Sequence, residues 1–146
     1  MNPSQKISEA IKDAMRAGDK VRLESLRYLL GQMQNAQIDK GLNAVLTEDE
    51  FLKIVRKIIK NSEEAMEQYK QGNRQDLVDD EMAKTSILRE LLPQALPKEE
   101  LRALVEKIHQ ENPDLAMGPL IGLVLKAAGG RADGRQVNEV IREVLG

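Results

Sequence analysis

Apolar residues recur at helical spacing along almost the whole chain. The first run places Ile7, Ala10, Ile11, Ala14 and Met15 at positions i, i+3, i+4, i+7 and i+8, the pattern of an amphipathic helix. Glycines, prolines and N-capping residues interrupt the pattern and mark helix ends. These signals predict seven helices, at about residues 7–17, 19–40, 47–71, 75–91, 97–111, 120–128 and 133–145. No segment alternates with the period of two that a half-buried strand requires.

Two of the predicted helix starts carry a capping box. Thr47 is followed three residues later by Glu50, and Asp133 by Gln136. In each pair both side chains can accept a backbone N–H that the helix itself leaves without a partner. The segment that starts at Thr47 is the longest of the seven and is predicted to carry a long amphipathic helix.

Two prolines interrupt the helical pattern between residues 92 and 97. Pro93 and Pro97 are four residues apart, and a proline inside a helix lacks the N–H donor and collides with the preceding turn. This stretch therefore predicts a joint between an N-terminal four-helix domain, residues 1–92, and a C-terminal three-helix domain, residues 97–146. The predicted fold class is all-α.

Composition and charge restrict the kind of core that the protein can form and the classes of partner that it can attract. Aromatic residues make up 2% of the chain, so aliphatic side chains must fill the core, which suits helix packing. The first 92 residues carry 15 basic and 16 acidic side chains and the rest carry 7 and 8, so neither part has a field that favours nucleic acid or membrane. The longest apolar stretch, Leu120–Leu125, is too short to span a bilayer. We expect a soluble cytoplasmic protein without a membrane contact.

The sequence contains no recognisable catalytic set. There is no cysteine, a single histidine (His109), and no nucleotide-binding or hydrolase motif. Acidic clusters occur at residues 63–67 and 79–81, but neither has the histidine three residues on that carboxylate metal sites use, so solvated helix faces are the better interpretation. We expect no catalytic residues, no metal and no cofactor.

One basic cluster is regular enough to suggest a binding surface. Lys53, Arg56, Lys57 and Lys60 lie at i, i+3, i+4 and i+7, away from the apolar face of their helix. Such a stripe can follow a phosphate backbone, although every amphipathic helix also has a solvated face. The shortage of aromatics argues against base recognition by stacking, so a bound RNA would be read by shape and phosphate.

Several short motifs together resemble the YqeY family. In chain order they are Asp19-Lys20-x-Arg22-Leu23-x-x-Leu26-Arg27, Leu46-Thr47-Glu48-Asp49-Glu50, Arg74-x-Asp76-Leu77-Val78-x-x-Glu81, Leu92-Pro93-x-x-Leu96, Met117-Gly118-x-x-x-Gly122 and Ala132-Asp133-Gly134-x-x-Val137. The resemblance covers essentially the whole chain. Two positions depart from the family pattern: Gly129 stands where relatives commonly have lysine, and Pro97 where they often have a serine cap.

The resemblance implies kinship with the C-terminal region of GatB, the tRNA-binding subunit of the glutamine-dependent aminoacyl-tRNA amidotransferase. That complex is a carbon–nitrogen ligase with glutamine as amido donor, and its chemistry lies in parts that this chain lacks. The resemblance thus implies a stand-alone, tRNA-binding accessory module. The alternative is a protein-interaction module that docks on a synthetase or amidotransferase; an autonomous amide-transfer enzyme is a third and weaker hypothesis.

Kinship with GatB directs the RNA contact to the C-terminal domain. The basic residues available there are Lys126, Arg131, Arg135 and Arg142. Arg135 and Arg142 are seven residues apart and share a helix face. Arg131 lies in residues 129–134, a segment that predicts an interhelical turn rather than a phosphate loop. It also precedes a helix start, where backbone N–H groups favour phosphate. We expect this set to contact tRNA, with the Lys53 stripe as the second candidate.

Overall fold

The computed structural model describes all 146 residues and contains seven α-helices and no strand. The helices are α1 (Pro3–Ala17), α2 (Lys20–Lys40), α3 (Glu48–Gln71), α4 (Gln75–Arg89), α5 (Lys98–Glu111), α6 (Met117–Ala128) and α7 (Gly134–Leu145). The predicted all-α fold class is therefore confirmed. Both predicted capping boxes are present, at Thr47 and at Asp133.

Three helices begin at residues other than those predicted from the spacing of apolar residues and prolines. α1 begins at Pro3 because the preceding Asn2 forms a third capping box with Gln5, which the spacing of apolar residues does not reveal. α6 begins at Met117 rather than near residue 120, because Pro119 falls in the first turn, where its missing N–H costs nothing. Pro97 was expected inside the first turn of α5 but is its N-cap residue.

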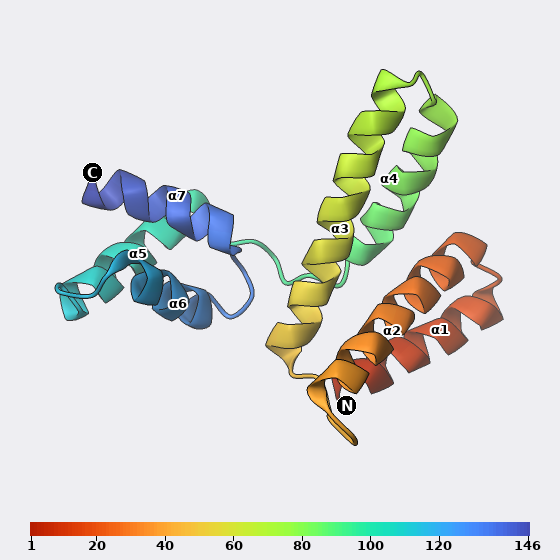
Figure 1. Cartoon of the computed structure of the whole chain (residues 1–146), viewed down its shortest axis with the longest axis horizontal. Coiled ribbons are helices and arrows are strands. Elements are labelled where there is room, and N and C mark those ends of the chain that lie inside the picture. Colours follow the sequence, from red (N-terminus) through yellow and green to blue (C-terminus); the bar gives the residue numbers. More distant parts are fainter. The chain divides into compact units, whose positions relative to one another are not determined.

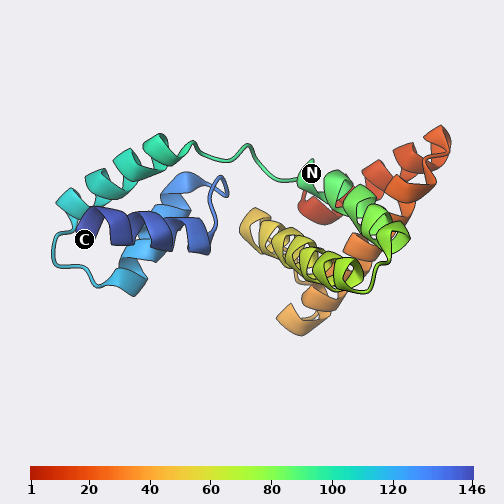
Figure 2. The same ribbon diagram turned by 90° about the horizontal axis from the view of Figure 1, so that it is seen from above.

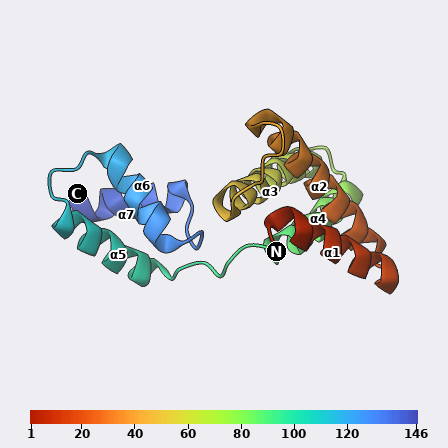
Figure 3. The same cartoon turned by 90° about the horizontal axis from the view of Figure 1, so that it is seen from below.

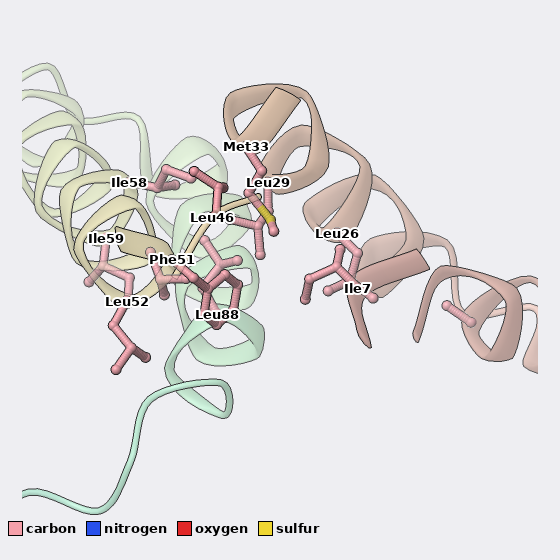
Figure 4. Close-up of a cluster of buried hydrophobic side chains, with 12 residues drawn as sticks. Ile7, Leu26, Leu29, Met33, Leu46, Phe51, Leu52, Ile58, Ile59 and Leu88 are labelled. Carbon is pink, nitrogen blue, oxygen red and sulfur yellow. The ribbon is translucent and has the colours of Figure 1, made fainter. Parts of the chain in front are cut away.

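Contacts between Cα positions divide the chain into two compact units, Met1–Leu92 and Pro93–Gly146. In the first unit α1 and α2 form one helical hairpin and α3 and α4 form another (Figure 1). α2 packs on α1, α3 and α4 and so joins the two hairpins. Aliphatic side chains from all four helices meet in its core (Figure 4), and the buried members include Ile7, Leu26, Leu29, Met33, Leu46, Phe51, Val55 and Leu88.

The second unit is built from three short helices. α5, α6 and α7 each pack on the other two (Figures 2 and 3). On its surface the Glu143 carboxylate of α7 accepts hydrogen bonds from Lys98, at 3.0 Å, and from Arg102, at 2.7 Å, both on α5. The core is again aliphatic, and its fully buried members include Val105, Leu120, Val124, Val137 and Ile141.

Several charged residues of the sequence motifs hold the first unit together. Asp19 caps α2, and the Arg22 guanidinium donates to the Glu90 carboxylate at 2.8 Å, which ties the start of α2 to the end of α4. This hydrogen bond lowers the pKa of the Glu90 carboxyl. Arg74 and Asp76 pair through two hydrogen bonds, of 3.1 and 3.0 Å, at the turn between α3 and α4. These motif residues therefore have structural roles in the fold.

Core packing around α2 predicts that two leucine-to-alanine substitutions differ widely in their effect on the free energy of unfolding. Leu29 is 0% exposed in the centre of α2, whereas Leu42 is 96% exposed in the loop that follows. We expect Leu29→Ala to lower the free energy of unfolding by about 2–5 kcal/mol, because it leaves a cavity. Leu42→Ala is the matched control and should change it by less than about 0.5 kcal/mol. Urea unfolding followed by circular dichroism measures both; equal effects would contradict the described core.

Candidate nucleic-acid interface

The solvent-facing side of α3 carries a row of lysines. The opposite face of the helix is buried through Phe51 and Val55 and their neighbours, which turns Lys53, Lys57 and Lys60 outward. All three are exposed, and none forms an ion pair with a carboxylate. We call these three residues the lysine stripe. Arg56, which the sequence places in the same stripe, is only half exposed and has a partner of its own within the protein.

Two of the acidic residues near the ends of the stripe, Glu50 and Glu63, are paired with other residues, whereas Asp49 and Glu64 lie exposed one helical turn from Lys53 and Lys60. Before it, Glu50 accepts hydrogen bonds from the Lys40 ammonium at 2.6 Å and from the Thr47 N–H at 2.9 Å. Lys40 is the main cause that lowers the pKa of Glu50 from 4.5 to about 2, with the capping N–H second. Beyond the stripe, Glu63 pairs with Arg89 of α4. The three lysines face solvent and form no ion pair with a carboxylate.

A small open pocket lies beside the stripe. It has a volume of about 300 Å³ and is lined by Ala36 of α2, Leu46 of the following loop, and Glu50, Lys53, Ile54 and Lys57 of α3. Two members of the stripe thus stand at its rim, while aliphatic side chains form its floor. No sequence pattern indicates this pocket, because its lining comes from two helices and a loop that meet only in the folded chain.

The C-terminal candidates do not form a comparable free cluster. Lys126, in the last turn of α6, and Arg142, in the last turn of α7, are exposed and form no ion pair. Arg135 pairs with Glu139 one helical turn further on, at 3.5 Å. The acidic Glu139 also lies between Arg135 and Arg142 on the face they share, so that face is not uniformly positive.

Arg131 has a structural role that its sequence position does not reveal. Its Nε donates a hydrogen bond to the Gln94 carbonyl at 2.9 Å, and its own carbonyl accepts the Leu96 N–H at 2.8 Å. Side chain and backbone thus both hold the proline-bounded segment on the turn between α6 and α7. This segment belongs to the second compact unit, which begins at Pro93 rather than at residue 97.

The start of α7 is not available to a phosphate in the way that the sequence suggested. The Asp133 carboxylate accepts the Gln136 N–H at 2.8 Å, and the Gln136 side chain accepts the Asp133 N–H at 3.1 Å. A carboxylate therefore already occupies this helix end and would repel a second anion. That N–H groups here assist Arg131 in binding phosphate stays a prediction, and the Asp133 carboxylate at this helix end argues against it.

The remaining sequence candidates are distributed over the surface. His109 is half-buried on α5, and its Nδ1 atom is buried without a hydrogen-bond partner. In the two acidic clusters Glu63 pairs with Arg89, and Glu81 accepts a hydrogen bond from Ser62 at 2.8 Å. Asp79 accepts one from Gln75, also at 2.8 Å.

The first unit also contains a larger cleft that the sequence did not indicate. Its volume is about 460 Å³, and α2, α3 and α4 all contribute to it. Three apolar residues line the cleft, Ile58, Ala65 and Leu88. The other lining side chains carry polar groups: Glu24, Ser25, Tyr28, Asn61, Ser62, Glu81 and Lys84.

None of the seven helices is both long enough and apolar enough to cross a membrane.

Comparison with known proteins identifies relatives along the whole chain. The profile of the YqeY family, described as Yqey-like protein, matches residues 4–145. The chain is 28% identical over 141 residues to altered inheritance of mitochondria protein 41, mitochondrial, from Pyrenophora tritici-repentis, an alignment that covers 93% of this chain and 77% of the relative. It is also 28% identical over 88 residues to an uncharacterized protein of Schizosaccharomyces pombe, covering 60% of this chain and 70% of that protein.

The contacts of Arg131 predict that the proline-bounded segment is protected from proteolysis and from amide hydrogen exchange. In Arg131→Gln the bond from Nε to the Gln94 carbonyl is lost, so we expect faster cleavage by elastase after Ala95 and faster amide exchange at Leu96. Arg135→Gln, which removes an exposed arginine of the same turn region, should change neither rate. Both rates are measured by mass spectrometry, and an unchanged segment in Arg131→Gln would refute the structural role.

The ion pair of Glu50 predicts a defined pH dependence. A carboxyl whose pKa falls from 4.5 to about 2 on folding stabilises the protein above pH 4.5, and this contribution is lost as the pH falls towards 2. We expect Glu50→Gln to be less stable than the wild type at pH 7, and the difference to shrink over that acidic interval. Urea midpoints at several pH values test this, with Glu48→Gln as control. A difference that stays constant down to pH 2 would contradict the assignment.

Proposed function

The chain belongs to the YqeY family, and we propose that it is a tRNA-binding accessory protein whose lysine stripe contacts the phosphate backbone. The single observation that carries this proposal is the row of three exposed lysines on α3 that no carboxylate neutralises. Helical rise separates Lys53 from Lys60 by about 10 Å, so the row presents successive charges along one line. Such a row can follow a nucleic-acid backbone without reading its sequence.

Because the protein as a whole is slightly acidic, an RNA contact must depend on local clusters of cations. With a net charge of −2 the chain has no general attraction for RNA, so affinity must come from the stripe and a few further cations. Lys126 and Arg142 are the exposed C-terminal candidates without an ion pair. We infer that they add to the contact, in keeping with the resemblance of this part to the GatB tail.

The proposal assigns two domains to the chain, one of four helices and one of three. The division into two compact units, at Leu92 and Pro93, supports this assignment. In this proposal the protein assists an aminoacyl-tRNA amidotransferase or a synthetase, and the amide-transfer chemistry belongs to that enzyme. A cytoplasmic location is part of the proposal; the name of the Pyrenophora relative places that protein in mitochondria.

A second function, docking on a protein partner, is favoured by a different observation. Three large apolar residues near the α2–α3 loop are exposed, Ile38 at 76%, Leu42 at 96% and Val45 at 51%. The loop that carries Leu42 and Val45 is held in place, because Lys40 donates to the Val45 carbonyl at 2.8 Å and to Glu50. An apolar surface on a well-defined loop is typical of an interaction site. In this alternative the partner is a synthetase or amidotransferase and RNA is not contacted directly.

Replacing the stripe tests the leading proposal. We expect the triple variant Lys53→Gln, Lys57→Gln, Lys60→Gln to bind tRNA more weakly at low salt, and the slope of log affinity against log salt to flatten by roughly 2 to 3. The matched control is Lys126→Gln with Arg142→Gln, which should flatten the slope less. Fluorescence anisotropy with labelled tRNA measures the affinities, and circular dichroism checks that helix content is unchanged.

Two results would overturn the proposal in different ways. If the C-terminal variant loses affinity and slope while the stripe variant keeps both, the RNA contact lies on the other unit. If the wild type does not bind tRNA at low salt, docking on a protein becomes the leading function, and Leu42→Glu should then abolish binding to a purified amidotransferase or synthetase.

A further inference from the structure

The pocket beside the lysine stripe combines two properties that phosphate binding alone does not require. Its floor is aliphatic, made by Ala36 and Ile54, which are half-buried, and by Leu46, which is 3% exposed in the loop between α2 and α3. Its rim carries the ammonium groups of Lys53 and Lys57. A site with an apolar base and a cationic edge matches a ligand that has an apolar face and a negative charge close to it.

The one carboxylate in the pocket does not cancel this rim. Glu50 Oε1 already accepts the Lys40 ammonium at 2.6 Å and the Thr47 N–H at 2.9 Å. The charge of Glu50 is thus balanced by Lys40, while Lys53 and Lys57 have no carboxylate partner. The pocket therefore has an excess of positive charge at its edge, although the protein as a whole is slightly acidic.

We propose that this pocket holds one unstacked nucleobase of the bound RNA, while Lys53 and Lys57 contact the phosphates on either side of that nucleotide. This inference rests on the proposed function and deepens it, since it names a base-binding site within the phosphate-binding surface. A nucleobase has flat apolar faces that can lie against aliphatic side chains, and proteins that take up unstacked bases use both aromatic and aliphatic surfaces for this purpose.

The size and composition of the pocket determine which part of the RNA it accepts. Its volume of about 300 Å³ is at the lower limit of small-ligand sites and has room for a single base. A base within a duplex cannot reach a pocket between two helices, so the bound nucleotide comes from a single-stranded end or loop. The lining has no aromatic ring, so recognition of the base is weak and the flanking phosphates supply most of the affinity.

Three small-molecule probes separate the contribution of the base from that of the phosphate. Adenosine 5′-monophosphate carries both groups, ribose 5-phosphate lacks the base, and adenosine lacks the phosphate. Titrations of the full chain followed by amide NMR shifts should show adenosine 5′-monophosphate binding most tightly, with shifts at Ala36 and Ile54. Ribose 5-phosphate should bind roughly five- to tenfold more weakly, because it loses the contact of the base with the floor.

Ala36→Leu fills the pocket without removing a lysine. We expect it to reduce binding of adenosine 5′-monophosphate to the level of ribose 5-phosphate, and to leave ribose 5-phosphate binding and the tRNA salt slope unchanged. Ala65→Leu is the matched control, because Ala65 is also half-buried and lines the separate 460 Å³ cleft. Ile54→Ala, which removes part of the floor, gives a second test should Ala36→Leu fail to fold.

The outcomes distinguish this inference from the proposed function. If adenosine 5′-monophosphate and ribose 5-phosphate bind equally, or if Ala65→Leu weakens binding as much as Ala36→Leu does, no base enters the pocket, and the phosphate contact survives. If tRNA affinity is unchanged in the triple lysine variant, the proposed function fails, whatever the mononucleotides show.

Discussion

Burial of one face of α2 is the interaction on which the first 92 residues depend. Leu26, Leu29 and Met33 are at most 1% exposed, and α2 is the helix that packs on α1, α3 and α4. The cluster is aliphatic apart from Phe51, in keeping with a chain that has only three aromatic residues. The apolar face of α3 packs on α4 and on α2, and this turns the opposite face, with its lysines, towards solvent. The candidate RNA surface is therefore a consequence of the core.

Charged residues in this protein divide into those that complete the fold and those that remain available. Arg22, Arg74 and Arg131 each donate hydrogen bonds to named acceptors within their own unit, and two of the three lie in the sequence motifs of the family. By contrast, the stripe lysines have no carboxylate partner. Motif residues such as Arg22 and Arg74 are thus used for folding, and a residue so used has less freedom to contact a ligand.

The two candidate RNA surfaces differ in what surrounds each cation. On α7, Arg135 pairs with Glu139, and the Asp133 carboxylate caps the helix start. On α3 the nearby Glu50 is paired with Lys40, and Glu63 with Arg89. A cation whose acidic neighbours are already paired attracts phosphate more strongly than one that shares a carboxylate. This difference is the physical reason to favour the α3 surface, although the family resemblance directs attention to the C-terminal helices.

The sequence by itself determined the all-α class, the number of helices and most of their ends. These features depend on local rules: apolar spacing, glycine breaks, and capping boxes such as Thr47 with Glu50. The lysine stripe was also predictable, because its residues lie on one helix. Only the tertiary structure decided that Arg131 holds Gln94 and that a pocket opens between Ala36 and Ile54. Both features join residues far apart in the chain, and no local pattern encodes which distant partner a side chain meets.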